Sequence, residues 1–458
     1  MGWQSFFQGR LLTRTEVLRI IQQESLDAQQ VWDTLKCQPA VTLSPLRCCR
    51  CHNEDPTQFH CFESLVGDTC TYCLACLSMG RCDSTSSLYY LARKEVQEDE
   101  GRMTISLGWQ GQLSTEQQRI SEGLVAGLQQ PLPQLVWAVT GAGKTEMLYA
   151  VIQTVLQQGG LVGLASPRVD VCLELVPRLA QAFPTVAQQV LYGDNPAPYQ
   201  PVPLTIATTH QLLRCRELFD LLIVDEVDAF PYVNSPQLHT AVQQAVTGTG
   251  HLIYLTATPD KALQRQIQQG QLHVQLLPAR YHRHPLPEPS FYWCGDWRGQ
   301  IESGRFKAKL WQLLSQFLAL EGSKLIFMPQ IELAEQLAKQ LRTAFPKVHL
   351  ESVHAQDPNR HEKVQCLRRQ ELDVLVTTTI LERGVTFVNC HVCILGAEHS
   401  GFSESALVQM SGRVGRNPNY PTGALWWLHQ GVSRAMRGAK SQIVQMNRLA
   451  RERGLLDE

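Results

Sequence analysis

The feature that most constrains the fold of this chain is a glycine-containing turn between an apolar run and an amphipathic segment. Residues 135–139 read LVWAV and residues 138–145 read AVTGAGKT, and a segment with helical spacing follows directly. Successive N–H groups in such a turn can surround an anion, and the first turn of a following helix adds a positive dipole. Strand, turn and helix in this order predict a parallel α/β sheet with a phosphate-binding edge.

The rest of the sequence extends this pattern into two tandem α/β domains. Residues 106–285 alternate apolar runs with helix-length segments, and residues 286–458 repeat the alternation. Continuous apolar runs of this kind are typical of buried parallel strands with crossover helices. Residues 1–105 form a separate N-terminal region. We interpret the acidic run EVQEDEG and the proline-containing RYHRHPLPEPS as the two linkers.

Composition excludes several classes of protein. The 458 residues include 41 Lys and Arg and 42 Asp and Glu, which argues against a generally basic coat protein of nucleic acids. No apolar run approaches the roughly 20 residues that cross a bilayer, and the N-terminus lacks the pattern of a secretion signal. We therefore expect a soluble, intracellular protein. Residues 286–458 have a small positive excess, 21 basic against 17 acidic residues. A polyanion would therefore bind more favourably to this part of the chain than to the rest.

The AVTGAGKT turn predicts a nucleotide site. Lys144 is expected to reach the β- and γ-phosphates, and the Thr145 hydroxyl to bind Mg²⁺. Gly141 and Gly143 supply the tight backbone, although Ala138 replaces the usual first glycine of the motif. The full predicted cradle is Thr140, Gly141, Ala142, Gly143, Lys144 and Thr145.

An acidic strand end supplies the second half of the predicted site. Residues 221–228 read LLIVDEVD. Asp225 can hold Mg²⁺, and Glu226 can polarise the attacking water, which is what phosphoryl transfer to water requires. The alternative is an ordinary acidic cap of the following helix.

Further signals follow other predicted strands. The string TAT places two hydroxyls, Thr256 and Thr258, on a tight turn. Residues 377–385 read TTTILERGV, and residues 409–416 read QMSGRVGR. The latter spacing predicts Arg413 and Arg416 on one helix face. Arginines of a second domain that reach a γ-phosphate in the first would make hydrolysis depend on domain closure.

These motifs, in this order, resemble those of superfamily 2 helicases. The strings ASPRVDVCLELVPRL, DEVDAFPY, RYHRHPLPEP and SALVQMSGRVGR resemble more closely the ComFA family, late-competence DNA-uptake ATPases of Gram-positive bacteria. This resemblance covers nearly the whole chain. It implies two RecA-like domains that hydrolyse ATP between them and hold DNA across both.

The resemblance also implies roles for individual residues. Gln117 falls where related helicases read adenine, and Gly384 falls in the nucleotide-binding set. Thr256 and Thr258 fall where ATP hydrolysis is coupled to DNA. Across the cleft, three residues would face the γ-phosphate: Gln409, Arg413 and Arg416. The nucleic-acid backbone would meet Pro167, Arg168, Thr208, Thr209, His210, Thr378 and Thr379.

Nine of the 15 cysteines lie between Cys37 and Cys82. Five of them, Cys48, Cys51, Cys70, Cys73 and Cys76, have C-x-x-C spacings that predict a four-cysteine Zn²⁺ site. Cys48 and Cys51 can pair with Cys70 and Cys73, or with Cys73 and Cys76. The first set leaves 18 residues between the pairs and fits the usual spacing, whereas the second leaves 21. The string YCLACLSMGR resembles the ComFA pattern, which favours Cys73 and Cys76. Cys70 and Cys61 are the reserves, and Cys82 is expected to be an ordinary thiol.

The favoured hypothesis is an ATP-driven translocase on single-stranded DNA that assists DNA uptake in natural competence, with ATP, Mg²⁺ and Zn²⁺ as cofactors. Expected partners are single-stranded DNA, a ComFC-type protein and a membrane DNA channel, at the inner face of the cytoplasmic membrane. One alternative is a PriA-like replication-restart or repair helicase. Another is a DNA-binding adaptor whose ATP site gates assembly.

Overall fold

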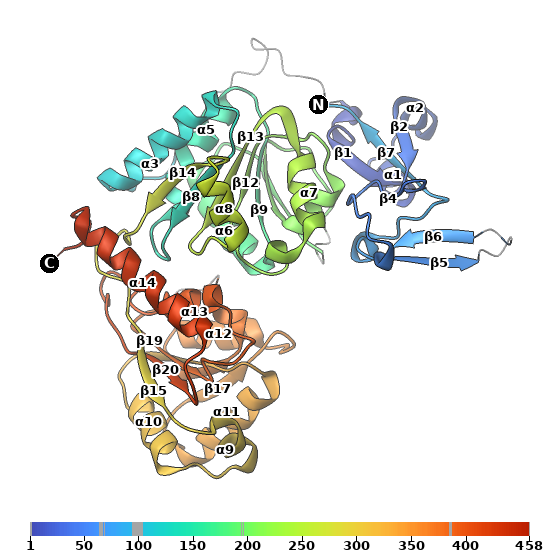
Figure 1. Cartoon of the computed structure of the whole chain (residues 1–458). Helices are drawn as coiled ribbons and strands as arrows, with labels where there is room; N and C mark the ends of the chain where they lie inside the picture. Colours follow the sequence, from blue (N-terminus) through green and yellow to red (C-terminus); the bar gives the residue numbers. More distant parts are fainter. Residues whose placement is uncertain are drawn as a thin grey trace. The chain divides into compact units, whose positions relative to one another are not determined.

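The computed structural model describes residues 2–63, 67, 69–93, 104–193, 195, 197–383 and 387–457 (Figure 1). The chain forms two compact units. The first contains residues 1–137 and 144–275, and the second contains residues 138–143 and 276–458. The predicted linker EVQEDEG lies outside the described residues, as does Gly384.

The first unit begins with a small lobe built on a three-stranded antiparallel sheet. The strand order is β1-β7-β2, with β1 at Arg10–Thr13, β7 at Ser87–Leu91 and β2 at Lys36–Pro39. The helices α1 (Arg14–Gln23) and α2 (Ala28–Thr34) accompany it. Phe7, Leu12, Val17, Ile20, Ile21 and Val31 form a separate small core in this lobe. A capping box, in which Thr13 and Glu16 exchange hydrogen bonds, fixes the start of α1.

Two hairpins carry four of the nine clustered cysteines of this lobe, Cys48, Cys61, Cys70 and Cys73. One pairs β3 (Val41–Leu43) with β4 (Leu46–Cys48), and the other pairs β5 (Phe59–Glu63) with β6 (Thr69–Cys73). The short 3₁₀ helix η3 (Leu77–Met79) follows β6. The β5–β6 hairpin extends from the lobe as a two-stranded ribbon (Figure 1).

The remainder of the first unit is organised by a seven-stranded sheet in the order β10-β11-β9-β12-β13-β8-β14. Its neighbours pair in parallel from β10 through to β8, as the continuous apolar runs predicted. The strands are β8 (Gln134–Ala138), β9 (Val162–Ser166), β10 (Gln188–Leu191), β11 (Leu204–Thr208), β12 (Phe219–Val224), β13 (Val246–Thr256) and β14 (His273–Leu277). Every side chain of β9 and β11 is buried.

Helices cover both faces of this sheet, with α5 on one side and α7 on the other (Figure 1). They are α3 (Thr115–Ala126), α4 (Lys144–Met147), α5 (Tyr149–Gln157), α6 (Val169–Ala182), α7 (Pro236–Ala245) and α8 (Lys261–Gln268). A 3₁₀ segment, η5 (Thr209–Arg214), continues directly from β11.

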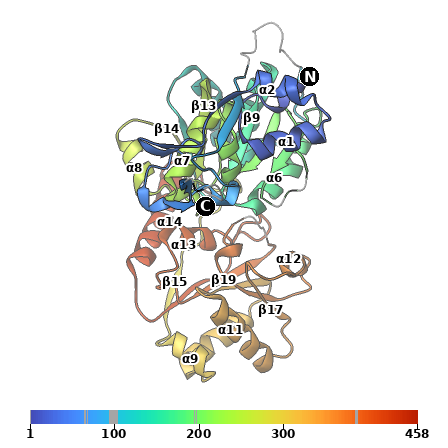
Figure 2. The ribbon, with the colours of Figure 1, turned by 90° about the vertical axis from the view of Figure 1, so that its right-hand side faces the viewer.

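The second unit repeats the architecture with six strands in the order β15-β20-β19-β16-β18-β17, all paired in parallel. The strands are β15 (Ser290–Trp293), β16 (Ser323–Phe327), β17 (Leu350–Val353), β18 (Val374–Thr377), β19 (Cys390–Leu395) and β20 (Leu425–His429). The helices are α9 (Trp297–Ser303), α10 (Ala308–Leu318), α11 (Ile331–Ala344), α12 (Arg360–Arg368), α13 (Glu404–Ser411) and α14 (Arg434–Glu452). The helices α13 and α14 pack together, away from α9 and α11 (Figures 1 and 2).

The two parallel α/β sheets preceded by a small cysteine-bearing lobe confirm the predicted fold class. Within the described residues, we find no helix with both the length and the apolar character needed to span a membrane.

Candidate nucleotide-binding and metal-binding sites

The phosphate loop has the backbone that its sequence predicted. Gly141 and Gly143 adopt φ values of +78° and +74°, which side-chain-bearing residues rarely adopt. The N–H of Ala142 donates to the carbonyl of Val139 at 3.2 Å and closes the turn. The helix α4 starts at Lys144, directly after the second glycine. The loop therefore delivers the chain to a helix N-terminus, the geometry that binds anions.

The two functional side chains of this loop lie at the start of α4. Lys144 is half-buried, and Thr145 is 8% exposed. The Thr145 hydroxyl accepts a hydrogen bond from Arg178 of α6 at 3.3 Å. Because a hydroxyl is a hard oxygen ligand, Thr145 is suited to bind Mg²⁺.

The predicted acidic residues follow β12. The N–H of Asp225 donates to the carbonyl of Ala165 on the neighbouring strand β9 at 2.8 Å, which fixes the strand end. The Asp225 carboxylate accepts from the N–H of Glu226 at 2.8 Å. Glu226 has φ +57°, a strained conformation for a residue with a side chain. Such strain persists where the surrounding structure enforces it, often at catalytic positions.

The two threonines of the TAT turn are tied to a residue that the sequence analysis did not single out. Thr256 Oγ1 donates to one oxygen of Asp228 at 2.7 Å, and Thr258 Oγ1 donates to the other at 2.6 Å. All three side chains are buried. Asp228 is the last residue of the string DEVD, so its spacing from Asp225 was a usable signal. This triad joins the acidic strand end to the TAT turn.

Gln117 takes part in the start of α3. Its Oε1 accepts from the N–H of Ser114 at 2.8 Å, and its own N–H donates to the Ser114 hydroxyl. The side chain is 5% exposed. It thus completes a capping box; its proposed contact with adenine stays a prediction.

The residues predicted to meet nucleic acid lie at the carboxyl ends of strands, but several are buried. Thr208 ends β11 and is 5% exposed, and Thr209 is 0% exposed. His210 is half-buried, and burial lowers the pKa of its imidazole. Around β9 and β18, Pro167 is buried while Arg168, Thr378 and Thr379 are half-buried. Any direct side-chain contact is therefore best assigned to the half-buried members.

In the second unit, the prediction that Arg413 and Arg416 share a helix face is wrong. The helix α13 ends at Ser411, and both arginines lie in the turn that follows. Gly412 and Gly415 interrupt the helix, and Gly415 has φ +64°. Gln409 lies within α13 and is 7% exposed. Arg413 is buried, and its Nε donates to the carbonyl of Glu382 at 3.1 Å.

A buried arginine that the sequence analysis did not identify holds this turn. Arg280 donates to the carbonyls of Gly412, Val414 and Gly415 at 3.2, 2.8 and 2.6 Å. Burial, with the nearby charge of Arg416, lowers the pKa of Arg280 to about 9. The N–H of the next residue, Tyr281, donates to the carbonyl of Gly141 at 3.1 Å, within the same unit.

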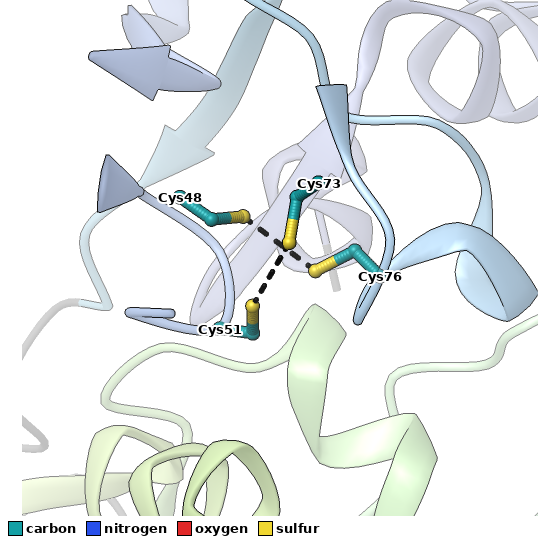
Figure 3. Close-up of side chains that lie close together, drawn as sticks. All are labelled: Cys48, Cys51, Cys73 and Cys76. Carbon is teal, nitrogen blue, oxygen red and sulfur yellow. Dashed lines mark hydrogen bonds between the residues drawn. The ribbon is translucent and has the colours of Figure 1, made fainter. Parts of the chain in front are cut away.

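Four buried cysteines form the candidate metal centre (Figure 3). Their sulfurs all lie within 4.8 Å of one another, with Cys48 and Cys76 at 3.6 Å and Cys51 and Cys73 at 3.7 Å. A tetrahedron with metal–sulfur bonds of about 2.3 Å places its sulfurs about 3.8 Å apart. Hydrogen bonds from the neighbouring thiols, Cys51 first, lower the pKa of Cys48. The donor set therefore fits Zn²⁺, and the structure brings together Cys48, Cys51, Cys73 and Cys76, the set that the sequence analysis chose.

The reserve cysteines lie elsewhere. Cys70 Sγ contacts the Thr85 hydroxyl at 3.9 Å, and Cys61 Sγ contacts the Thr71 hydroxyl at 3.3 Å. Cys82, expected to be an ordinary thiol, is fully buried in the same apolar cluster but is not one of the four cysteines whose sulfurs meet. Its separation from the C-x-x-C pairs gave no sign of this.

The sequence matches three family models: Competence protein ComFA N-terminal domain over residues 2–90, Type III restriction enzyme, res subunit, over 110–261, and Helicase conserved C-terminal domain over 308–418. It is 40% identical over 450 residues to Competence protein ComFA of Bacillus subtilis, covering 98% of this chain and 95% of that protein. Its identity to Competence protein ComFA of Streptococcus pneumoniae is 43% over 379 residues, covering 83% and 86%.

Solved structures show the same fold at low identity. Saccharomyces cerevisiae Dbp5 bound to RNA and ADP BeF3 matches with a TM-score of 0.55 at 15% identity, covering 73% of this chain and 92% of that one. Mycobacterium smegmatis helicase Lhr bound to ssDNA and AMP-PNP matches with 0.55 at 18%, covering 74% and 50%. Together with the family models over residues 110–261 and 308–418, this fold shows that the two α/β domains are RecA-like helicase domains.

Proposed function

Because this chain belongs to the competence protein ComFA family, we propose that it is an ATP-driven translocase on single-stranded DNA that assists DNA uptake in natural competence. Its helicase domains make it an ATP-dependent enzyme that acts on nucleic acid. The observation that carries the finer proposal is identity of 40% to Competence protein ComFA across nearly the full length of both chains.

The phosphate loop, the start of α4 and the end of β12 support a hydrolytic ATP site. Lys144 and the loop N–H groups would bind the phosphates, and Thr145 and Asp225 would hold Mg²⁺, which supplies charge neutralisation at the transferring phosphoryl group. Glu226 would orient water. Gln409, Arg413 and Arg416 would contribute across a closed cleft, and Gln117 would meet adenine.

The coupling of ATP hydrolysis to DNA would run through strand ends. The hydrogen bonds from Thr256 and Thr258 to Asp228 connect the acidic strand end with the turn after β13. The half-buried residues Arg168, His210, Thr378 and Thr379 would track the phosphate backbone, where basic and polar groups bind without sequence preference. We propose a ComFC-type protein and a membrane DNA channel as partners, at the inner face of the cytoplasmic membrane.

The test is ATP turnover with single-stranded DNA, duplex DNA, RNA and no nucleic acid, with Lys144→Ala as the inactive control. We expect single-stranded DNA to raise the rate most. Equal rates with and without DNA would contradict the motor. Robust duplex unwinding together with normal DNA uptake in a deletion strain would favour the PriA-like helicase. Full cellular function of Glu226→Gln would favour the ATP-gated adaptor.

A further inference from the structure

The cysteine-bearing lobe packs on the segment that leads away from β11. One buried cluster contains the zinc-site cysteines together with Met79 of η3 and Leu212 and Leu213 of η5. The chain after η5 also joins the lobe, because Cys215 forms an antiparallel bridge with Arg10 and the N–H of Arg216 donates to the carbonyl of Gly9 at 2.8 Å. The segment Thr208–Arg214 is thus held from the side of the metal centre.

Arg50, between Cys48 and Cys51, ties the two cysteine pairs to each other. It is 0% exposed and donates to the carbonyls of Met79 at 3.1 Å and Cys76 at 3.4 Å, and also to that of Gly80. Its Nε is buried and makes no hydrogen bond among the described residues. Four thiolates around Zn²⁺ carry a net charge of about −2, and a buried guanidinium beside them offsets that charge.

Glu16 extends this charged group towards η5. One of its oxygens accepts from the N–H of Thr13 at 2.9 Å in the capping box of α1. The other accepts from Nε of Arg214, and the charge of Arg50 also acts on this carboxylate. The carboxylate therefore pairs directly with an arginine of η5, while Arg50 acts on it only through its charge.

Arg214 is the last residue of η5 and fixes it internally as well. Its guanidinium donates to Oε1 of Gln211 at 2.7 Å and contacts Sδ of Met79 at 4.0 Å. A continuous set of contacts therefore runs from the cysteines through Arg50 and Met79 to Arg214, which pairs with Glu16 and ends the segment that begins at Thr208.

We propose that the zinc-bearing lobe positions the segment Thr208–Arg214 for single-stranded DNA, with Arg50, Glu16 and Arg214 as positioning residues. This inference rests on the proposed function, which places Thr208–His210 on the DNA path. It differs from a lobe that grips DNA itself, since residues 1–105 carry more acidic than basic groups and the charges of Arg50 and Arg214 are used internally.

The test measures the concentration of single-stranded DNA that gives half-maximal ATPase, the maximal rate, the KM for ATP and the zinc content. In Glu16→Gln and in Arg214→Gln we expect the half-maximal concentration to rise about tenfold, as for loss of a charged hydrogen bond. The KM for ATP and the zinc content should not change. The double variant should resemble either single variant, and Arg214→Lys should keep much of the affinity.

Glu54→Gln is the matched control, because it removes an exposed ion pair with Arg47 in the same lobe. Chelation of zinc should raise the half-maximal concentration in the wild type and add little in Glu16→Gln. The inference would be overturned if Glu16→Gln and Arg214→Gln had the same half-maximal DNA concentration as Glu54→Gln. It would also be overturned if the effects of the two single variants added fully in the double variant. Absence of any stimulation in the wild type would instead refute the proposed function.

Discussion

Thr256 donates a hydrogen bond of 2.7 Å to Asp228, and neither side chain is accessible to solvent beyond a few per cent. Thr256 ends the strand β13, whereas Asp228 follows the strand β12 by a few residues. The bond therefore joins the TAT turn to the acidic residues expected to serve ATP hydrolysis. A displacement of either element can therefore reach the other through this hydrogen bond.

Replacing Thr256 by valine tests this route, because valine keeps the shape and removes the hydroxyl. We expect basal ATPase to persist and the stimulation by single-stranded DNA to fall about tenfold, since hydrogen bonds to charged groups contribute about 1.5–3 kcal/mol. Thr240→Val is the control; its hydroxyl donates only to the carbonyl of Pro236 on the exposed side of α7. Equal loss of basal and stimulated rates would contradict a coupling role.

Elemental analysis tests the metal centre. We expect about one zinc per chain, as four thiolates in tetrahedral reach bind a single ion. Cys76→Ser should lose it, while Cys70→Ser, which changes a buried cysteine outside the cluster, should retain it. Zinc in the Cys76 variant and none in the Cys70 variant would show that the other cysteine pair is the ligand set.

The sequence allowed the prediction of elements whose pattern is local. The apolar runs located β8, β9, β11 and β12. The C-x-x-C spacings left two sets of four cysteines open, and the ComFA-like string YCLACLSMGR selected the set with Cys73 and Cys76 that the structure brings together. Contacts across long separations were not predictable in this way. Arg280 reaches carbonyls more than 130 residues away, and Cys82 is buried in the same apolar cluster as the metal-site cysteines without a motif that places it there. The helical placement of Arg413 failed because α13 ends at Ser411, with Gly412 as its C-cap, so that Arg413 lies in the following turn.

Arg280→Lys should destabilise the second unit. Lysine has one ammonium group in place of the planar guanidinium that spans three carbonyls, so at least one buried acceptor loses its donor, at a cost of about 1–3 kcal/mol. The measurement is the urea midpoint of the full chain. Arg283→Lys, at a half-exposed ion pair with Asp457, should shift the midpoint far less. Equal shifts in the two variants would argue against a special role for Arg280.

The pH dependence of stability should reveal the Glu16–Arg214 pair. Burial disfavours the charged carboxylate, but Arg214 and the backbone bond from Thr13 outweigh burial and hold the pKa of Glu16 below its ordinary value of 4.5. A carboxyl group with a lowered pKa in the folded state stabilises the fold fully above the unfolded value, and this stabilisation is lost as pH falls through the folded value. The free energy of unfolding of wild type should therefore exceed that of Glu16→Gln by about 1.5–3 kcal/mol at pH 7.

This stability difference should shrink as the pH is lowered below 4.5, the ordinary value for this group. Urea unfolding of both proteins at a series of pH values gives the difference directly, and any loss of zinc that both share cancels from it. Glu54→Gln should show only a small difference from wild type throughout, since its ion pair is exposed and such pairs contribute at most about 1 kcal/mol. A difference between wild type and Glu16→Gln that stays constant into acid would mean that Glu16 acts by packing, without its charge.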